Sequence, residues 1–236
     1  MKKILILTMV FSLFGCAEMQ QVMNQFPQTD GAGLITISGG LKEALNNGIS
    51  KQVTKLTATD GFYKNEAVKI LLPEELRKVD AGLRSIGLSS LADEGLKVLN
   101  RAAEDAVKEA TPIFVDAVTK MSFADARGIL MGSESSATNY LQNSTSTALY
   151  GKFNPVIKNS FTKVGAYKVW TNIITKYNSI PLVRKVNPDL TDYVTNQALN
   201  GVFKMVAVEE RNIRTNLNSR TSVLLQRVFA LQDTKI

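Results

Sequence analysis

Apolar residues recur every three or four positions along most of this chain, a spacing that predicts amphipathic α-helices. In residues 39–56 the apolar positions on one helical face are Leu41, Leu45, Ile49, Val53 and Leu56. Segments of the same kind cover 73–87, 91–110, 113–121, 124–132, 135–163, 166–180, 189–216 and 220–231. The pattern predicts a mainly α fold, a single domain of roughly eight helices with largely antiparallel helix packing.

Three local signals refine this pattern. Ser122 and Asp125 have the spacing of a capping box, which predicts a helix start at 122. Asn154 and Pro155 lie inside the segment 135–163 and predict a break there. The stretch "AVKILLP" (67–73) fits either a short extended segment or a helix end.

The first fifteen residues differ from the rest. Lys2 and Lys3 precede an apolar run over 4–14, which is too short to span a bilayer because a span needs about 20 apolar residues. The layout is typical of a secretory signal peptide (1–15). "LFGC" ends in Cys16, the single cysteine of the chain, and is similar to a bacterial lipobox.

This resemblance implies cleavage before Cys16 and acylation of its sulfur. Several acyl chains hold a protein stably on a membrane, where one holds it only marginally. Ala17, rather than an aspartate, favours the outer membrane of a double-membraned bacterium, with the protein facing the periplasm. We expect residues 16–38 to form the lipidated N-terminus and a flexible tether, and 39–236 the helical domain.

The amino-acid composition limits the kinds of catalytic and metal site that the chain can form. The chain has 28 Lys and Arg against 21 Asp and Glu, a formal charge of +7, and no histidine. The lack of imidazole excludes His-based zinc sites and His-dependent triads, although Ser-Lys and carboxylate-pair chemistry remain. "NRAAEDA" (100–106) fits a polar helix–helix contact better than half of a carboxylate site, and "GSESSATNY" (132–140) fits a helix cap better than an anion site. We predict no enzyme activity, no metal and no cofactor.

Charge is segregated along the sequence, because no acidic residue lies between Glu134 and Asp189. The basic residues of this stretch are Lys152, Lys158, Lys163, Lys168, Lys176, Arg184 and Lys185. Aromatic residues are interleaved with them, a combination that suits anionic membranes, sugars or nucleic acid. Nucleic acid is disfavoured as a partner, because the signal peptide predicts export from the cytoplasm. The alternative is a solvated lysine face whose aromatic residues point into the core.

One carboxylate falls within an apolar seam. The seam follows steps of three and four through Leu199, Phe203, Val206, Glu210, Ile213 and Leu217. An isolated buried charge is very unfavourable, so Glu210 needs a partner. Arg214, four residues later, is the nearest candidate, and Arg211 or a basic group on a facing helix is the alternative. We predict a structural ion pair.

Four segments follow one another along the helical region: "NRAAEDAVKEATPIFVDAV" (100–118), "MSFADARGILMGSESSATNYL" (121–141), "YVTNQALNGVF" (193–203) and "EERNIRTNLNSRTSVLLQRVF" (209–229). Together they resemble a family of bacterial envelope lipoproteins catalogued as domain of unknown function 4197. The sequence departs from the family pattern at Leu217, where a proline is expected, and at Ala230, where a glycine is expected. The resemblance implies a helical domain and a lipoprotein address, and it implies no reaction.

The expected function is therefore non-enzymatic binding or scaffolding at the periplasmic face of the outer membrane. The partners would be the membrane itself, through the acyl chains, and an anionic lipid or envelope polymer. A protein partner is not indicated. The alternative is a carrier that holds a lipid or another apolar ligand between its helices.

Overall fold

The computed structural model describes residues 31–85, 87, 89–163, 170–171, 174–175, 178–179, 181–182, 185, 187 and 189–233. Eight α-helices and no strand are found among these residues, which confirms the mainly α, single-domain prediction. The helices are α2 (Gly31–Thr57), α3 (Glu74–Ser85), α4 (Ser89–Val107), α5 (Ala110–Lys120), α6 (Phe123–Leu130), α7 (Ser136–Lys163), α9 (Thr191–Thr215) and α10 (Val223–Asp233), with a 3₁₀ turn η1 (Leu217–Ser219). Most of the helix expected over 166–180 lies outside the described residues.

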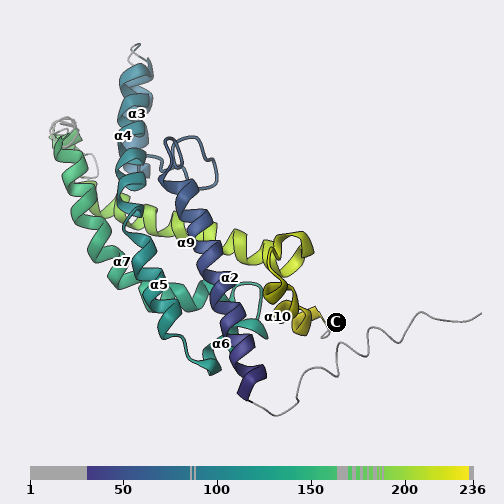
Figure 1. The fold of residues 1–236 in the computed structure, drawn as a ribbon. Helices are drawn as coiled ribbons and strands as arrows, with labels where there is room; N and C mark the ends of the chain where they lie inside the picture. The colour runs from purple at the N-terminus through teal and green to yellow at the C-terminus, as the bar shows by residue number, and fades with distance from the viewer. Residues whose placement is uncertain are drawn as a thin grey trace, which may run out of the picture.

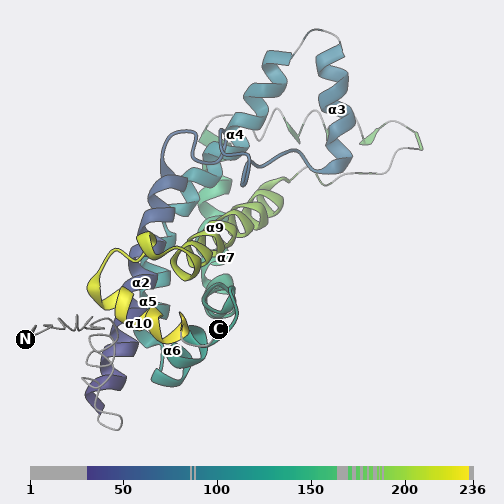
Figure 2. The ribbon, with the colours of Figure 1, turned by 90° about the vertical axis from the view of Figure 1, so that its right-hand side faces the viewer.

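The helices form an elongated bundle with two distinct ends. The α3–α4 hairpin and the C-terminal end of α7 lie at one end, and the start of α2 lies with α6 and α10 at the other (Figures 1 and 2). The pairs α3–α4 and α4–α7 are antiparallel, as expected. Helix α9 instead crosses the bundle and contacts α2, α4 and α7, so it joins helices that are far apart in sequence.

The core is apolar and built around aromatic side chains. Phe62, Phe114 and Phe153 are fully buried, and the rings of Phe114 and Phe203 meet edge to face at 6.0 Å. Small residues let helices approach closely at several points. Buried alanines of α4 are Ala102, Ala103 and Ala106, and Gly201 of α9 lies against the Phe62 ring.

Two helix boundaries differ from the sequence prediction. Helix α2 begins at Gly31, so residues 31–38, which were expected in the tether, are helical. Helix α7 passes through Pro155 without ending, so the expected break is wrong. Phe153 and Ile157 are buried on either side of the proline, and this packing outweighs one missing backbone hydrogen bond.

Two local predictions have clear outcomes. The capping box is confirmed, because Ser122 Oγ accepts from the Asp125 N–H at 3.1 Å and Asp125 Oδ2 accepts from the Ser122 N–H at 3.0 Å. "AVKILLP" is neither helix nor ladder strand, and lies in an irregular segment between α2 and α3.

Candidate functional site

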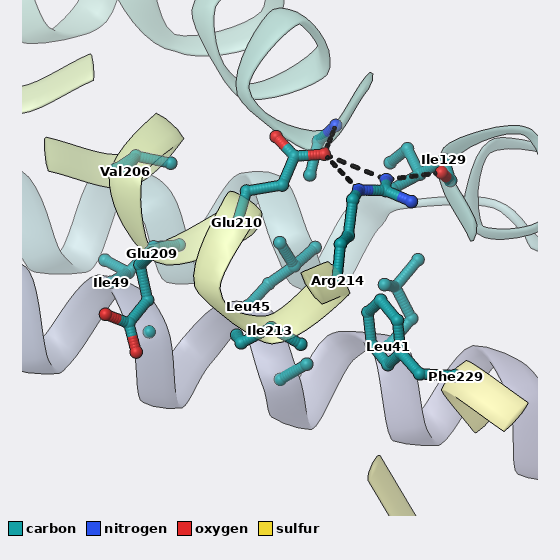
Figure 3. A pocket seen from close by; sticks show the side chains of 13 residues that line it. Leu41, Leu45, Ile49, Ile129, Val206, Glu209, Glu210, Ile213, Arg214 and Phe229 are labelled. Carbon is teal, nitrogen blue, oxygen red and sulfur yellow. Dashed lines mark hydrogen bonds and ion pairs between the residues drawn. The ribbon is translucent and has the colours of Figure 1, made fainter. Parts of the chain in front are cut away.

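Glu210 and Arg214 face each other in the buried side of α9. The side chains are 6% and 2% exposed, and Arg214 Nη2 donates to Glu210 Oε1 at 2.9 Å. Arg214 Nε donates to the same oxygen at 3.0 Å (Figure 3). The predicted partner of Glu210 is therefore in place, one helical turn away.

The Glu210 carboxylate also caps the start of α7. It accepts the backbone N–H groups of Ala137 at 2.9 Å and Thr138 at 2.8 Å, and the Thr138 hydroxyl at 2.8 Å. Free N–H groups and the helix dipole make a helix N-terminus favourable for an anion. The anion at "GSESSATNY" is thus a carboxylate of the protein itself, which the spacing of that stretch did not reveal.

Arg214 performs the complementary role at the end of α6. Its Nη2 donates to the Ile129 carbonyl at 2.8 Å, and Nη1 donates to the Leu130 carbonyl at 3.3 Å and to Gln232 Oε1 at 3.1 Å. A cation is favoured at a helix C-terminus, where carbonyl groups lack partners. The pair therefore fastens the end of α6 and the start of α7 to α9, which is a structural role.

The apolar seam is shorter than predicted. Leu199, Phe203, Val206 and Ile213 are buried, but Leu217 is 67% exposed. Helix α9 ends at Thr215, and the Asn216 side chain accepts from the Asn218 N–H to form a turn. Leu217 thus lies beyond the helix, and its place in the seam was a wrong prediction.

A cavity of about 30 Å³ lies beside this pair, between α2 and α9. Its apolar lining includes Leu41, Leu45, Ile49, Val206, Ile213 and Phe229 (Figure 3). Such a volume matches about one water molecule, whereas sites for small molecules measure about 300–1,000 Å³. This cavity therefore gives no support to the alternative of a lipid carrier.

Glu209, the neighbour of Glu210, points towards α2 (Figure 3). It accepts from Lys51 Nζ and from Gln52 Nε2, both at 2.6 Å. Asp116 pairs with Lys120, and Asp125 belongs to its capping box. Within the described residues, no group of three acidic side chains is placed to hold a metal ion.

The "NRAAE" segment of α4 fastens the loop between α2 and α3. Asn100 accepts from the Ile70 N–H at 2.8 Å and donates to the Ile70 carbonyl at 2.9 Å. Glu104 accepts from the Phe62 N–H at 3.1 Å, and Arg101 bonds both Glu104 and Asp60 at 2.6 Å. The expected helix–helix contact is thus a helix–loop contact, because two side chains of α4 replace the missing partners of an irregular backbone.

The basic stretch is described only in part. Lys152, Lys158 and Lys163 are exposed on α7, while Lys168 and Lys176 lie outside the described residues. The neighbouring aromatic residues Phe153, Phe161 and Trp170 are buried, so they belong to the core and not to the lysine surface. The inward alternative therefore holds for these aromatic residues, and the lysines remain available to solvent.

The proposed lipidation site, Cys16, also lies outside the described residues. Among the helices that the structure describes, none combines the length and apolarity needed to cross a bilayer.

Comparison with known proteins identifies a family. A family model described as "Protein of unknown function (DUF4197)" matches residues 34–230. No curated protein and no solved structure matches the chain. The family match includes every helix from α3 to α9 and most of α2 and α10. The chain therefore belongs to the domain-of-unknown-function 4197 family.

Proposed function

We propose that this chain is a non-enzymatic envelope protein, held at the periplasmic face of the outer membrane by acyl chains on Cys16. It binds an anionic surface through the exposed side of α7. The observation that carries the proposal is the charge of this helix. Ser136–Lys163 contains three lysines, all exposed, and no acidic residue.

Some of the other exposed lysines are paired, whereas Lys55, Lys78, Lys97 and Lys204 are exposed and, like the lysines of α7, form no ion pair with a described residue. Lys64, Lys108 and Lys120 are also exposed, but each lies within 2.9 Å of a carboxylate three or four residues away. None of the α7 lysines forms an ion pair with a described residue. Their charge is therefore not locally compensated, and it is available to an anionic partner.

The buried charges favour binding over catalysis. Each buried charged side chain forms hydrogen bonds with other residues of the protein. These side chains are Glu104, Glu209, Glu210, Arg214 and Arg220. Arg220, for example, donates to the Ile213 and Arg214 carbonyls at 3.0 Å and closes the end of α9. These groups hold helix ends and loops together, and their satisfied state supports a structural role.

The first test concerns the anchor. Cys16→Ser removes the acyl acceptor, so we expect an unacylated, mis-processed precursor that keeps its signal peptide. The measurements are the intact mass of the protein and its partition between membrane and soluble fractions. Normal processing and unchanged membrane attachment of the variant would refute the anchor.

The second test concerns the lysines, in a chain that lacks residues 1–16, so that neither acyl chains nor the signal peptide take part. We expect the chain to bind phosphatidylglycerol vesicles better than phosphatidylcholine vesicles. Each lysine near an anionic surface contributes about 1 kcal/mol, so replacing Lys152, Lys158 and Lys163 with Gln should weaken binding by about tenfold or more. Binding should also weaken with salt, because the Debye length falls as ionic strength rises.

A matched control makes the same charge change elsewhere. The variant Lys64→Gln, Lys108→Gln, Lys120→Gln removes three lysines that are already paired, and it should keep most of the binding. Equal loss in both triple variants would indicate a response to net charge alone. Equal binding to both vesicle types would contradict an electrostatic surface.

A further inference from the structure

The start of α2 lies at one end of the bundle, and the lysines of α7 lie in the C-terminal half of that helix, which runs towards the other end (Figure 1). Helix α2 begins beside α6 and α10, whereas α7 ends beside the α3–α4 hairpin (Figures 1 and 2). Helices α2 and α7 contain 27 and 28 residues. At 1.5 Å per residue each is about 40 Å long, so the two ends of the bundle are separated by a distance of this order.

The described part of the chain therefore begins at the end remote from Lys158 and Lys163. The 14 residues 17–30 separate Cys16 from the start of α2, and a random coil of this length would span roughly 20 Å on average. Electrostatic attraction to a membrane decays over about 8 Å at physiological salt. When the domain stands with the start of α2 towards its membrane, the lysines are beyond the reach of that membrane's charge.

The arrangement of the lysines around α7 is also informative. At about 100° per residue, Lys152 and Lys163 lie within about 20° of each other, and Lys158 lies about 120° from Lys152. Phe153, Ile157 and Phe161 occupy the buried side, so the lysines flank an exposed ridge. A flat bilayer meets one flank of such a ridge at a time. A linear chain that crosses the ridge can meet both.

From these observations we propose that the α7 ridge binds a linear anionic polymer on the side of the protein that faces away from its own membrane. The protein thus links the membrane to this polymer. This inference rests on the proposed function, because it takes both the Cys16 anchor and the lysine surface from it. It adds the class of partner and the orientation of the domain.

Orientation is tested with the acylated full chain in phosphatidylcholine vesicles, which do not attract the lysines, and which contain a lipid-borne fluorescence quencher. Once Cys16 is acylated, the chain has no free thiol, so one introduced cysteine can be labelled selectively. Thr162→Cys places a dye near the end of α7 and leaves the lysines intact. Gly128→Cys places it on α6, at an exposed position where an added Cβ meets no atom within 4 Å. We expect strong quenching at 128 and little at 162.

The partner is tested with the same vesicles and two soluble-phase probes, polygalacturonate and separate phosphatidylglycerol vesicles. We expect the anchored chain to retain polygalacturonate at the vesicle surface, and replacement of Lys152, Lys158 and Lys163 with Gln to reduce retention at least tenfold. The Lys64, Lys108, Lys120 control variant should retain it. Both triple variants should keep the quenching at 128, which shows that each remains anchored.

The outcomes separate the two proposals. Equal quenching at 128 and 162 overturns the orientation, even where lysine-dependent binding to anionic vesicles persists. Lysine-dependent capture of anionic vesicles without capture of polygalacturonate overturns the polymer. Failure of the lysine substitutions to affect either probe overturns the lysine surface itself, and with it the proposed function.

Discussion

The carboxylate of Glu210 accepts the backbone N–H of Thr138 at 2.8 Å, across 72 residues of the chain. The same side chain accepts from Arg214, which in turn holds the last carbonyls of α6. One buried ion pair thus satisfies the end of one helix and the start of the next. Removal of this pair should therefore destabilise both α6 and α7.

Glu210→Ala should lower the free energy of unfolding by about 3–5 kcal/mol, because it leaves Arg214 buried without its carboxylate and the start of α7 without its cap. Urea unfolding followed by circular dichroism measures the effect. The control is Glu134→Ala, which removes an exposed carboxylate 3.6 Å from Arg211 and should change stability by less than about 1 kcal/mol. Equal effects of the two substitutions would contradict the capping role.

Asn100→Ala should destabilise the loop between α2 and α3. The substitution leaves the N–H and carbonyl of Ile70 buried without partners, and each such group costs about 1–3 kcal/mol. Hydrogen exchange should also accelerate at the Ile70 amide. Exchange that stays as slow as in the unmodified chain would mean that the amide is protected by something other than Asn100. Asn139→Ala, at an exposed position of α7, serves as the control.

Two glycine substitutions within helices should have opposite signs. An added Cβ at Gly201 would lie 2.7 Å from the Phe62 ring, so Gly201→Ala should destabilise the protein by about 1–3 kcal/mol. At Gly151 of α7 it would meet nothing within 4 Å, so Gly151→Ala should stabilise the protein by about 0.5–1 kcal/mol. Thermal unfolding of both variants gives the comparison. A stabilising Gly201→Ala would refute the close contact.

Acid should weaken the contact between Arg220 and Asp233. The hydrogen bonds from Arg220 lower the pKa of Asp233, so this interaction is fully present above the ordinary carboxyl value of about 3.9 and is lost as pH falls through the lowered pKa. Asp233→Asn should therefore destabilise the protein at pH 7, and the difference from the unmodified chain should shrink towards pH 2. Unfolding measured across this range provides the check. A difference that is constant with pH would exclude ionisation of Asp233 as its source.

The sequence predicts features that depend on neighbours along one helix. The seam of α9 identified Glu210 as buried, and the one-turn spacing identified Arg214. The contact with Ala137 and Thr138 depends on how two distant helices dock, and no local spacing encodes it. The break predicted at Pro155 was wrong for a related reason. The helix continues through this proline because the residues on both sides of it pack against other helices, and local sequence does not show such contacts.

The misplacement of Leu217 is different, since a local signal was present. The apolar periodicity continues past Thr215, but Asn216 favours a turn whose side-chain oxygen accepts a nearby backbone N–H. The loop contacts of Asn100 and Glu104 could be predicted only in part. Their burial could be expected from the neighbouring alanines, but the loop backbone as their partner could not.

The position of α9 late in the chain governs when this domain can acquire its structure. A chain is synthesised from its N-terminus, so α2 to α7 are complete before Glu209 and Glu210 exist. Until then Gln52 lacks its partner 157 residues later, the start of α7 has no cap, and Phe62 has no Gly201 to pack against. The earlier helices can pack against one another before then, but the core is complete only once α9 joins them, when nearly nine-tenths of the chain is available.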